Sequence, residues 1–158
     1  MGRTELVAQF LNEDPSLLDS YLPEGFTALA LAAHFGHIET LEFLIARGGN
    51  VNAVSKHAMN VTPLHAALFG QRIGAAKVLV AAGADVTPKR GGTGWPRAGW
   101  TALHYAAGFG FADLAQTFID HGADLHARDD EGNTPLQVAI DEGQHQVAEL
   151  LRRLGASE

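Results

Sequence analysis

The sequence predicts an all-α solenoid of stacked helix–turn–helix units, and a regular internal repeat is the basis of this prediction. A related motif begins at four threonines: Thr27, Thr62, Thr101 and Thr134. A glycine stands 21 residues after each of them, at Gly48, Gly83, Gly122 and Gly155. Self-similarity at a fixed period is typical of stacked repeat architectures, so these two observations indicate the fold class.

The first repeat shows how local signals define two helices. Thr27 can cap an inner helix that we predict over Ala28 to Phe35, because its oxygen accepts from free backbone N–H groups. Gly36 supplies the positive φ that a tight turn requires. An outer helix is predicted over Ile38 to Arg47, and Gly48 ends it. The other three repeats show the same order of signals.

The apolar positions predict a core that neighbouring repeats share. Small alanines on the inner helices allow antiparallel helices to approach closely, and large apolar side chains fill the space between repeats. A single repeat cannot bury this face alone, so stacking supplies the stability. The predicted core positions are Leu29, Leu64, Leu103 and Leu136 on the inner helices, with Leu44, Leu79, Phe118 and Leu151 on the outer helices.

The repeated motif resembles that of the ankyrin repeat family. Residues 62–67 read Thr-Pro-Leu-His-Ala-Ala, which matches the family pattern Thr-Pro-Leu-His-x-Ala. Residues 83–86 and 122–125 are similar to the family's Gly-Ala-Asp-Val element. The resemblance covers about Thr4 to Gly155. It implies short β-hairpin fingers between the repeats, and binding of proteins through the fingers and the concave face of the inner helices.

The repeats predict a single domain over residues 1–158. Residues 4–21 are interpreted as an N-terminal half repeat, with a helix over Thr4 to Asn12 that Thr4 caps. Repeat 1 covers residues 22–54 and repeat 2 covers 55–87. Residues 88–127 hold a long finger and repeat 3. Residues 128–158 form repeat 4, interpreted as a C-terminal cap because Arg152 replaces an apolar residue of the other repeats.

Two departures from the family pattern stand out. The spacing between successive threonines is 35, 39 and 33 residues, against a family period of 33. The extra residues fall in the fingers, and the longest finger spans Thr87 to Trp100. In repeat 2, Gln71 stands where the turn glycine is expected and Gly70 comes one position early, so the sequence leaves the end of that inner helix open.

Composition narrows the function classes. Apolar residues make up 46% and charged residues 18%, as in an ordinary globular protein. The net charge of −7 argues against nonspecific nucleic-acid binding, which needs a basic surface. The chain has no cysteine, so disulfides and thiolate metal sites are excluded. With neither a signal-peptide pattern nor a membrane-spanning run, we predict a cytoplasmic protein with no membrane partner.

Catalytic, cofactor and metal sites are not predicted. The chain lacks the Walker spacing and the Gly-x-Ser-x-Gly elbow, so we predict no enzyme activity and no cofactor. His65 and His104 belong to the repeat motif and are interpreted as structural. Gly36 separates His34 from His37, which argues against a metal site there.

Two surfaces are predicted to bind a protein partner. Phenylalanines at the inner-helix ends would form an apolar stripe on the concave face, although they could instead pack beneath the fingers. The fingers add basic and aromatic residues of the types enriched at binding hot spots. Trp100 precedes the Thr101 cap and is interpreted as structural, whereas Trp95 is open to either role. The candidate residues are Phe35, Phe69, Phe109, Lys56, His57, Met59, Arg90, Trp95 and Arg97.

On this basis, the sequence predicts a protein–protein interaction scaffold. Two alternatives stay open: a self-associating structural protein, and an accessory or inhibitory subunit of an enzyme whose cleft the long finger enters. A monomer is expected over a homo-oligomer.

Overall fold

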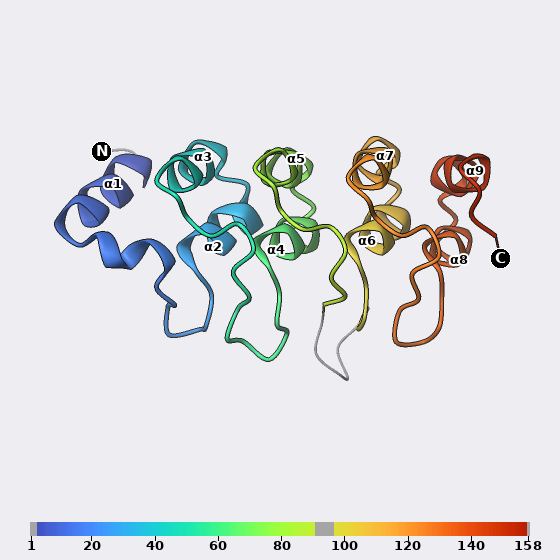
Figure 1. The fold of residues 1–158 in the computed structure, drawn as a ribbon, viewed down its shortest axis with the longest axis horizontal. Helices are drawn as coiled ribbons and strands as arrows, with labels where there is room; N and C mark the ends of the chain where they lie inside the picture. Colours follow the sequence, from blue (N-terminus) through green and yellow to red (C-terminus); the bar gives the residue numbers. More distant parts are fainter. Residues whose placement is uncertain (1–2, 91–96, 158) are drawn as a thin grey trace. The chain divides into compact units, whose positions relative to one another are not determined.

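The computed structural model describes residues 3–90 and 97–157, and these residues confirm the all-α prediction. They contain nine α-helices, one short 3-10 helix and no strand longer than an isolated bridge (Figure 1). The chain divides into two compact units, residues 1–84 (unit 1) and 85–158 (unit 2). Each unit is described by itself, and the single domain over residues 1–158 stays a prediction.

Unit 1 pairs inner and outer helices in two successive repeats. The inner helices α2 and α4 lie side by side, and the outer helices α3 and α5 pack against each other above them (Figure 1). A first helix, α1, packs on α3. The elements are α1 (Arg3–Glu13), the 3-10 helix η1 (Pro15–Asp19), α2 (Ala28–Phe35), α3 (Ile38–Ala46), α4 (Pro63–Phe69) and α5 (Ile73–Ala81).

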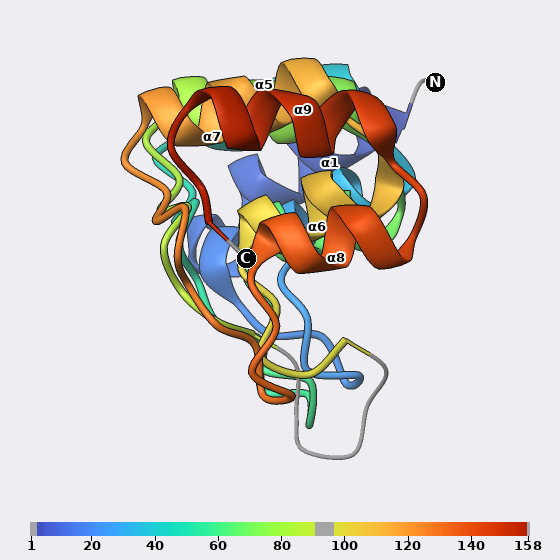
Figure 2. The same cartoon turned by 90° about the vertical axis from the view of Figure 1, so that its right-hand side faces the viewer.

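Unit 2 repeats this arrangement. The inner helices α6 and α8 form one layer, and the outer helices α7 and α9 form a second layer (Figure 2). The elements are α6 (Ala102–Phe109), α7 (Ala112–Asp120), α8 (Pro135–Asp141) and α9 (His145–Arg153).

A threonine caps each of the four inner helices, as predicted. Its hydroxyl oxygen accepts from the backbone N–H three residues later, at 3.2 to 3.4 Å. In α4 and α6 this third residue is a histidine whose Nδ1 lies 2.8 Å from the threonine oxygen. Such a cap contributes about 1 kcal/mol. The repeated threonine therefore fixes the start of each inner helix.

The first helix differs from its prediction. It begins at Arg3, so Thr4 lies within the helix and does not cap it. The Thr4 hydroxyl instead forms a hydrogen bond with the Thr40 hydroxyl of α3 at 2.7 Å. A tertiary partner 36 residues away thus replaces the local role that the sequence suggested.

The turn after α4 shows how the chain accommodates Gly70 and Gln71. Gln71 adopts the positive φ of 55°, as Gly36 does with 74° in the preceding repeat. Gly70 keeps a right-handed conformation as the residue after the helix. A Cβ atom at Gly70 would collide with the carbonyl oxygen of His34. Gly70 is therefore needed for close approach between two inner helices, and Gln71 carries the backbone strain.

The predicted core is confirmed. All eight predicted core side chains are at most 1% exposed. Alanines of the inner helices, including Ala33, Ala67, Ala106 and Ala107, are completely buried. Small side chains on the inner helices and large ones between repeats thus build the core in each unit.

The fingers, which join an outer helix to the next inner helix, are less regular than the predicted β-hairpins. The described residues form only two isolated bridges, Tyr21 with Thr27 and Arg90 with Trp100. Backbone hydrogen bonds cross single fingers, as from Ser55 to Val61 and from Asp129 to Asn133. Others join adjacent fingers: Lys56 donates to Gly25 and Asp130 donates to Ala98. The described fingers are thus linked both within and between repeats, without a two-stranded ladder.

Candidate functional site

An apolar recess lies between the two repeats of unit 1. Its volume is about 220 Å³. The inner helices α2 and α4 form one wall, and residues that lead into them from the fingers form the other. His34 donates from Nδ1 to the carbonyl of Ala66 at 3.1 Å, which holds the two helices together at the recess. The lining residues are Phe26, Ala30, Leu31, His34, Met59, Val61, Ala66 and Phe69.

The apolar recess brings together two predicted binding residues from different elements. Phe69 comes from the end of α4 and is 38% exposed, and Met59 comes from the finger. His57 is next to the recess, where its ring stacks on Phe26 with centroids 5.1 Å apart. Lys56 lies over the ring of Tyr21 at 4.3 Å.

Phe35 has a different position from Phe69. It is 56% exposed and is not part of the recess lining. Counted from the capping threonine, Phe69 corresponds to His34, whereas Phe35 corresponds to Gly70. The two rings are thus offset by one helical position.

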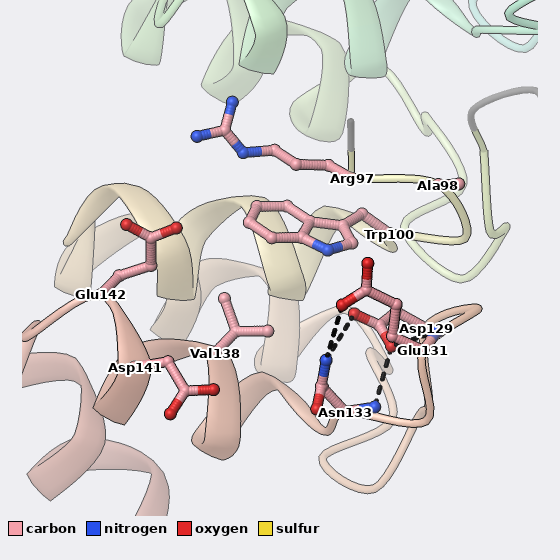
Figure 3. A pocket seen from close by; sticks show the side chains of 9 residues that line it. All are labelled: Arg97, Ala98, Trp100, Asp129, Glu131, Asn133, Val138, Asp141 and Glu142. Atoms are coloured by element: carbon pink, nitrogen blue, oxygen red, sulfur yellow. Dashed lines mark hydrogen bonds between the residues drawn. The ribbon is translucent and has the colours of Figure 1, made fainter. Parts of the chain in front are cut away.

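A second recess, which we call the acidic recess, lies within unit 2. Its volume is about 230 Å³. Figure 3 shows Trp100 between Arg97 and Val138, with Asp129 and Glu131 on one side and two more carboxylates on the other. The lining residues are Arg97, Ala98, Trp100, Asp129, Glu131, Asn133, Val138, Asp141 and Glu142.

Trp100 forms the aromatic wall of the acidic recess. It is only 6% exposed, in agreement with its predicted structural role. The ring packs over Gly108, where an added Cβ would lie 2.7 Å from an indole carbon. The Arg97 guanidinium lies 5.1 Å from the centre of the Trp100 ring and 4.7 Å from that of Phe109. Arg97 thus directs its charge at two aromatic faces.

Asp129 is the most buried carboxylate of the acidic recess, with 7% exposure. Its Oδ1 accepts from the backbone N–H groups of Glu131 at 3.0 Å and Asn133 at 2.8 Å. Its Oδ2 accepts from Asn133 Nδ2 at 3.4 Å. All three donors are uncharged amide groups, so amide dipoles, and no cationic side chain, orient the Asp129 carboxylate.

The two recesses occupy the same place in their repeats. Thr62 and Thr134 begin equivalent motifs 72 residues apart. The same separation relates four pairs of lining residues: Met59 and Glu131, Val61 and Asn133, Ala66 and Val138, and Phe69 and Asp141. The same part of the repeat therefore forms an apolar recess in unit 1 and an acidic recess in unit 2.

The residues predicted to bind a partner include none of the four carboxylates of the acidic recess. Two of these carboxylates belong to Asp141 and Glu142, at the C-terminal end of α8. Both are exposed, but both line the recess. The signal that could have revealed them is their register, since Asp141 stands where repeat 2 has Phe69. Comparison of equivalent positions across repeats would have placed a carboxylate at a binding position.

Phe109 and Arg90 of unit 2, which were also predicted to bind a partner, are not among the residues that line the acidic recess. Phe109 is half-buried, and its ring centre lies 6.1 Å from that of Tyr105 and 5.7 Å from that of Phe111. The backbone N–H of Arg90 donates to the carbonyl of Trp100 at 3.1 Å. Trp95 lies outside the described residues. Phe109 belongs to a different unit from Phe35 and Phe69, so the three-residue stripe stays a prediction.

Two residues of α6, His104 and Tyr105, have side chains whose pKa values are shifted by burial. Burial lowers the pKa of His104 below 6.5, although the backbone hydrogen bond to Asn133 opposes this shift. His104 Nε2 lies 3.0 Å from the Asn133 carbonyl oxygen. Burial also raises the pKa of Tyr105 to about 12. Both groups are uncharged at neutral pH, which suits a packed interior.

Two kinds of feature are missing from the residues that the structure describes. No group of three or more His, Cys, Asp or Glu side chains in residues 3–90 and 97–157 is placed to hold a metal ion. Within the same ranges, every helix is too short or too polar to cross a bilayer.

Comparison with known proteins supports the resemblance noted in the sequence. The chain is similar to the C. elegans "Transient receptor potential cation channel subfamily A member 1 homolog", with 32% identity over 93% of this chain and 11% of that protein. It is 32% identical to human "Protein phosphatase 1 regulatory subunit 27" over 67% of this chain and 64% of that protein. The mouse "Nuclear factor NF-kappa-B p105 subunit" is 30% identical over 90% of this chain and 14% of that protein. The chain thus spans less than two thirds of each relative.

Family models agree with these relatives over nearly the whole chain. A model described as "Ankyrin repeats (3 copies)" matches residues 1–90 and 92–157. A second model, "Ankyrin repeats (many copies)", matches residues 64–119. Together with the four capped helix pairs and the buried core of each unit, these matches show that the chain belongs to the ankyrin-repeat family.

Proposed function

We propose that this chain is a binding scaffold that holds a protein partner in the apolar recess of unit 1. Ankyrin repeats generally mediate protein–protein interactions and are typically non-enzymatic. The observation that carries the proposal is the recess itself, where Phe69 and Met59 meet from a helix and a finger. We also propose a cytoplasmic location.

The chemistry of the recess favours an apolar anchor from the partner. Its eight lining residues are aliphatic, aromatic or methionine, apart from His34. The Nδ1 atom of His34 is already hydrogen-bonded to Ala66. A leucine or phenylalanine of the partner would gain about 1.5–3 kcal/mol from burial there. Methionine adapts its shape to different partners, which suits a residue that lines such a recess.

The predicted finger and helix-end residues extend this proposal. Lys56 and His57 come from the finger of repeat 2, next to the recess. Phe35, with 56% exposure, offers a second apolar contact on the same unit. In unit 2, Phe109, Arg90 and Arg97 stay proposed partner contacts, and so does Trp95 outside the described residues. Removal of residues 89–97 without loss of binding would exclude the contribution of the long finger.

A matched pair of variants tests the recess. Affinity capture identifies a partner, whose binding to purified wild type, Phe69→Ala and Ile73→Ala is then measured by calorimetry. Ile73 is the control because its 39% exposure is close to the 38% of Phe69 and it lies in unit 1 outside the recess. We expect about a 30-fold loss for Phe69→Ala, as for an interface hot spot, and little change for Ile73→Ala. Equal affinity of all three proteins would contradict the proposal.

A second candidate function is the regulatory subunit of an enzyme. The specific observation in its favour is the similarity to "Protein phosphatase 1 regulatory subunit 27", which covers 64% of that relative. Addition of the purified chain to protein phosphatase 1 should then change its activity in a saturable manner. Unchanged activity, together with no complex on gel filtration, would exclude this enzyme as the partner.

A further inference from the structure

We propose that the acidic recess of unit 2 binds a basic side chain, arginine or lysine, of a protein partner. The proposal rests on the proposed function in that the chain binds proteins. It concerns a different recess, so it can succeed or fail separately. The ligand class follows from the charge, the walls and the burial of the recess.

The charge of the recess is strongly negative. Four carboxylates line it, from Asp129, Glu131, Asp141 and Glu142, against the one guanidinium of Arg97, which leaves −3. The whole chain has the same sign, with a net charge of −7. Charges in a recess with low-dielectric walls focus the field and attract oppositely charged groups. The complementary ligand is therefore a cation.

Arg97 is the cation among the lining residues, but its guanidinium does not act as the ligand of the recess. Arg97 stacks on Trp100 and Phe109, at 5.1 and 4.7 Å from their ring centres. The hydrogen bonds that the Asp129 side chain accepts come from amides of Glu131 and Asn133. Its Oδ2 accepts only one of them, at the long distance of 3.4 Å. A carboxylate that is 93% buried thus keeps an oxygen with spare hydrogen-bonding capacity in the wall of the recess.

The walls favour an organic cation over a metal ion. Across the described residues, no group of three or more His, Cys, Asp or Glu side chains is placed to hold a metal ion. Figure 3 shows Asp129 and Glu131 on the opposite side of Trp100 from Asp141 and Glu142. Trp100 and Val138 lie between these pairs and provide apolar surface. Lysine and arginine bury an aliphatic stem against such a surface while they present the charge at its edge.

The repeat register supports a binding role for this position. Four lining residues of the acidic recess occupy the same repeat positions as four lining residues of the apolar recess of unit 1, through the 72-residue correspondence. The geometry of the repeat thus provides the hollow, and the local residues decide which side chain fits. Glu131 and Asp141 replace Met59 and Phe69, so the preferred occupant changes from apolar to basic.

A titration followed by NMR tests the proposal on the full chain. The probes are blocked Gly-Ala-Arg-Ala-Gly peptides and matched peptides with lysine or with citrulline in place of arginine. Citrulline keeps the planar shape of arginine but carries no charge. The indole N–H signal of Trp100 reports on the recess, and a Trp95→Phe variant identifies which of the two tryptophan signals it is.

Two double variants separate recognition from general attraction. Asp141→Asn with Glu142→Gln removes two charges from the recess lining, where both side chains are exposed. Asp120→Asn with Glu149→Gln removes two exposed charges of unit 2 outside the lining. We expect saturable shifts of Trp100 with the arginine or lysine peptide, and about tenfold weaker binding for the recess variant alone.

Three outcomes would overturn the proposal. Equal shifts with the citrulline peptide would show that charge is not recognised. An equal loss in both double variants would show nonspecific attraction to an acidic surface. No saturable shift up to about 10 mM of either cationic peptide would exclude a recess for basic side chains. None of these results bears on the Phe69→Ala measurement, so failure of this proposal is distinguishable from failure of the proposed function.

Discussion

At the scale of single residues, the turn after α4 shows where this sequence departs from its own repeat. Three of the four inner helices are followed by a glycine with φ between 70° and 76°, at Gly36, Gly110 and Gly143. Repeat 2 has Gln71 there with φ of 55°. A residue with a Cβ pays about 1–2 kcal/mol for this conformation. Gln71 is therefore a local weakness of unit 1.

We predict that Gln71→Gly stabilises the protein by about 0.5–1 kcal/mol. Relief of the left-handed strain outweighs the greater entropy of glycine in the unfolded chain. Urea denaturation followed by circular dichroism measures the change. Gln71→Ala is the control, since alanine retains the Cβ and should leave the stability nearly unchanged. A glycine variant no more stable than the alanine variant would contradict the strain argument.

Local signals were sufficient for much of the fold. Thr27 and Gly36 predicted the bounds of α2 as the structure has them, because the cap and the turn are decided by neighbouring residues. Thr4 was predicted wrongly, since its partner Thr40 is distant in the sequence. The acidic recess was missed for the same reason: Trp100 and Asp141 come from different repeats. Sequence patterns describe each repeat well and the space between repeats poorly.

At the scale of elements, His104 couples an inner helix to the next finger of unit 2. Its Nδ1 lies 2.8 Å from the capping oxygen of Thr101, and its Nε2 lies 3.0 Å from the carbonyl of Asn133. Asn133 also holds Asp129 in the wall of the acidic recess. The helix cap, the finger and the recess therefore share one hydrogen-bond network.

We predict that stability depends on pH through His104. Its pKa is lowered in the folded protein by burial, so folding favours the neutral ring. The contribution is complete above the unfolded value of 6.5 and is lost as the pH falls below it toward the folded pKa. His104→Gln should therefore lose less stability than wild type between neutral and mildly acidic pH.

Urea titrations of both proteins at several pH values measure this difference. Glutamine is a suitable replacement because Gln137 occupies the equivalent position in repeat 4, where Thr134 still caps the helix. The other seven histidines titrate in both proteins, so only the difference between the curves reports on His104. Parallel curves would show that His104 does not titrate differently in the folded and unfolded states.

The fingers differ from the β-hairpins that the resemblance to the ankyrin repeat family implied. The resemblance implied β-hairpins, yet the described fingers form only isolated bridges. Hydrogen bonds from Lys56 to Gly25 and from Asp130 to Ala98 also link neighbouring fingers. These pairings depend on how repeats stack, which a single repeat sequence does not specify.

At the scale of the whole molecule, each unit combines a buried core with a recess on its surface. The core side chains are fully buried, whereas Phe35 and Phe69 stay 56% and 38% exposed. Such exposure of large apolar side chains costs solubility, and it is typical of surfaces that bind partners. We propose that a protein partner covers the inner-helix ends and fingers around the apolar recess.

Hydrogen–deuterium exchange on the chain alone and on its complex with the captured partner tests this claim most directly. We predict slower exchange in the complex for peptides that cover residues 55–61 and 69–72, where the finger and the end of α4 border the recess. Peptides that cover the outer helices α3 and α5 should exchange at equal rates with and without partner. Protection confined to these outer helices, with the finger and the end of α4 unchanged, would contradict the account.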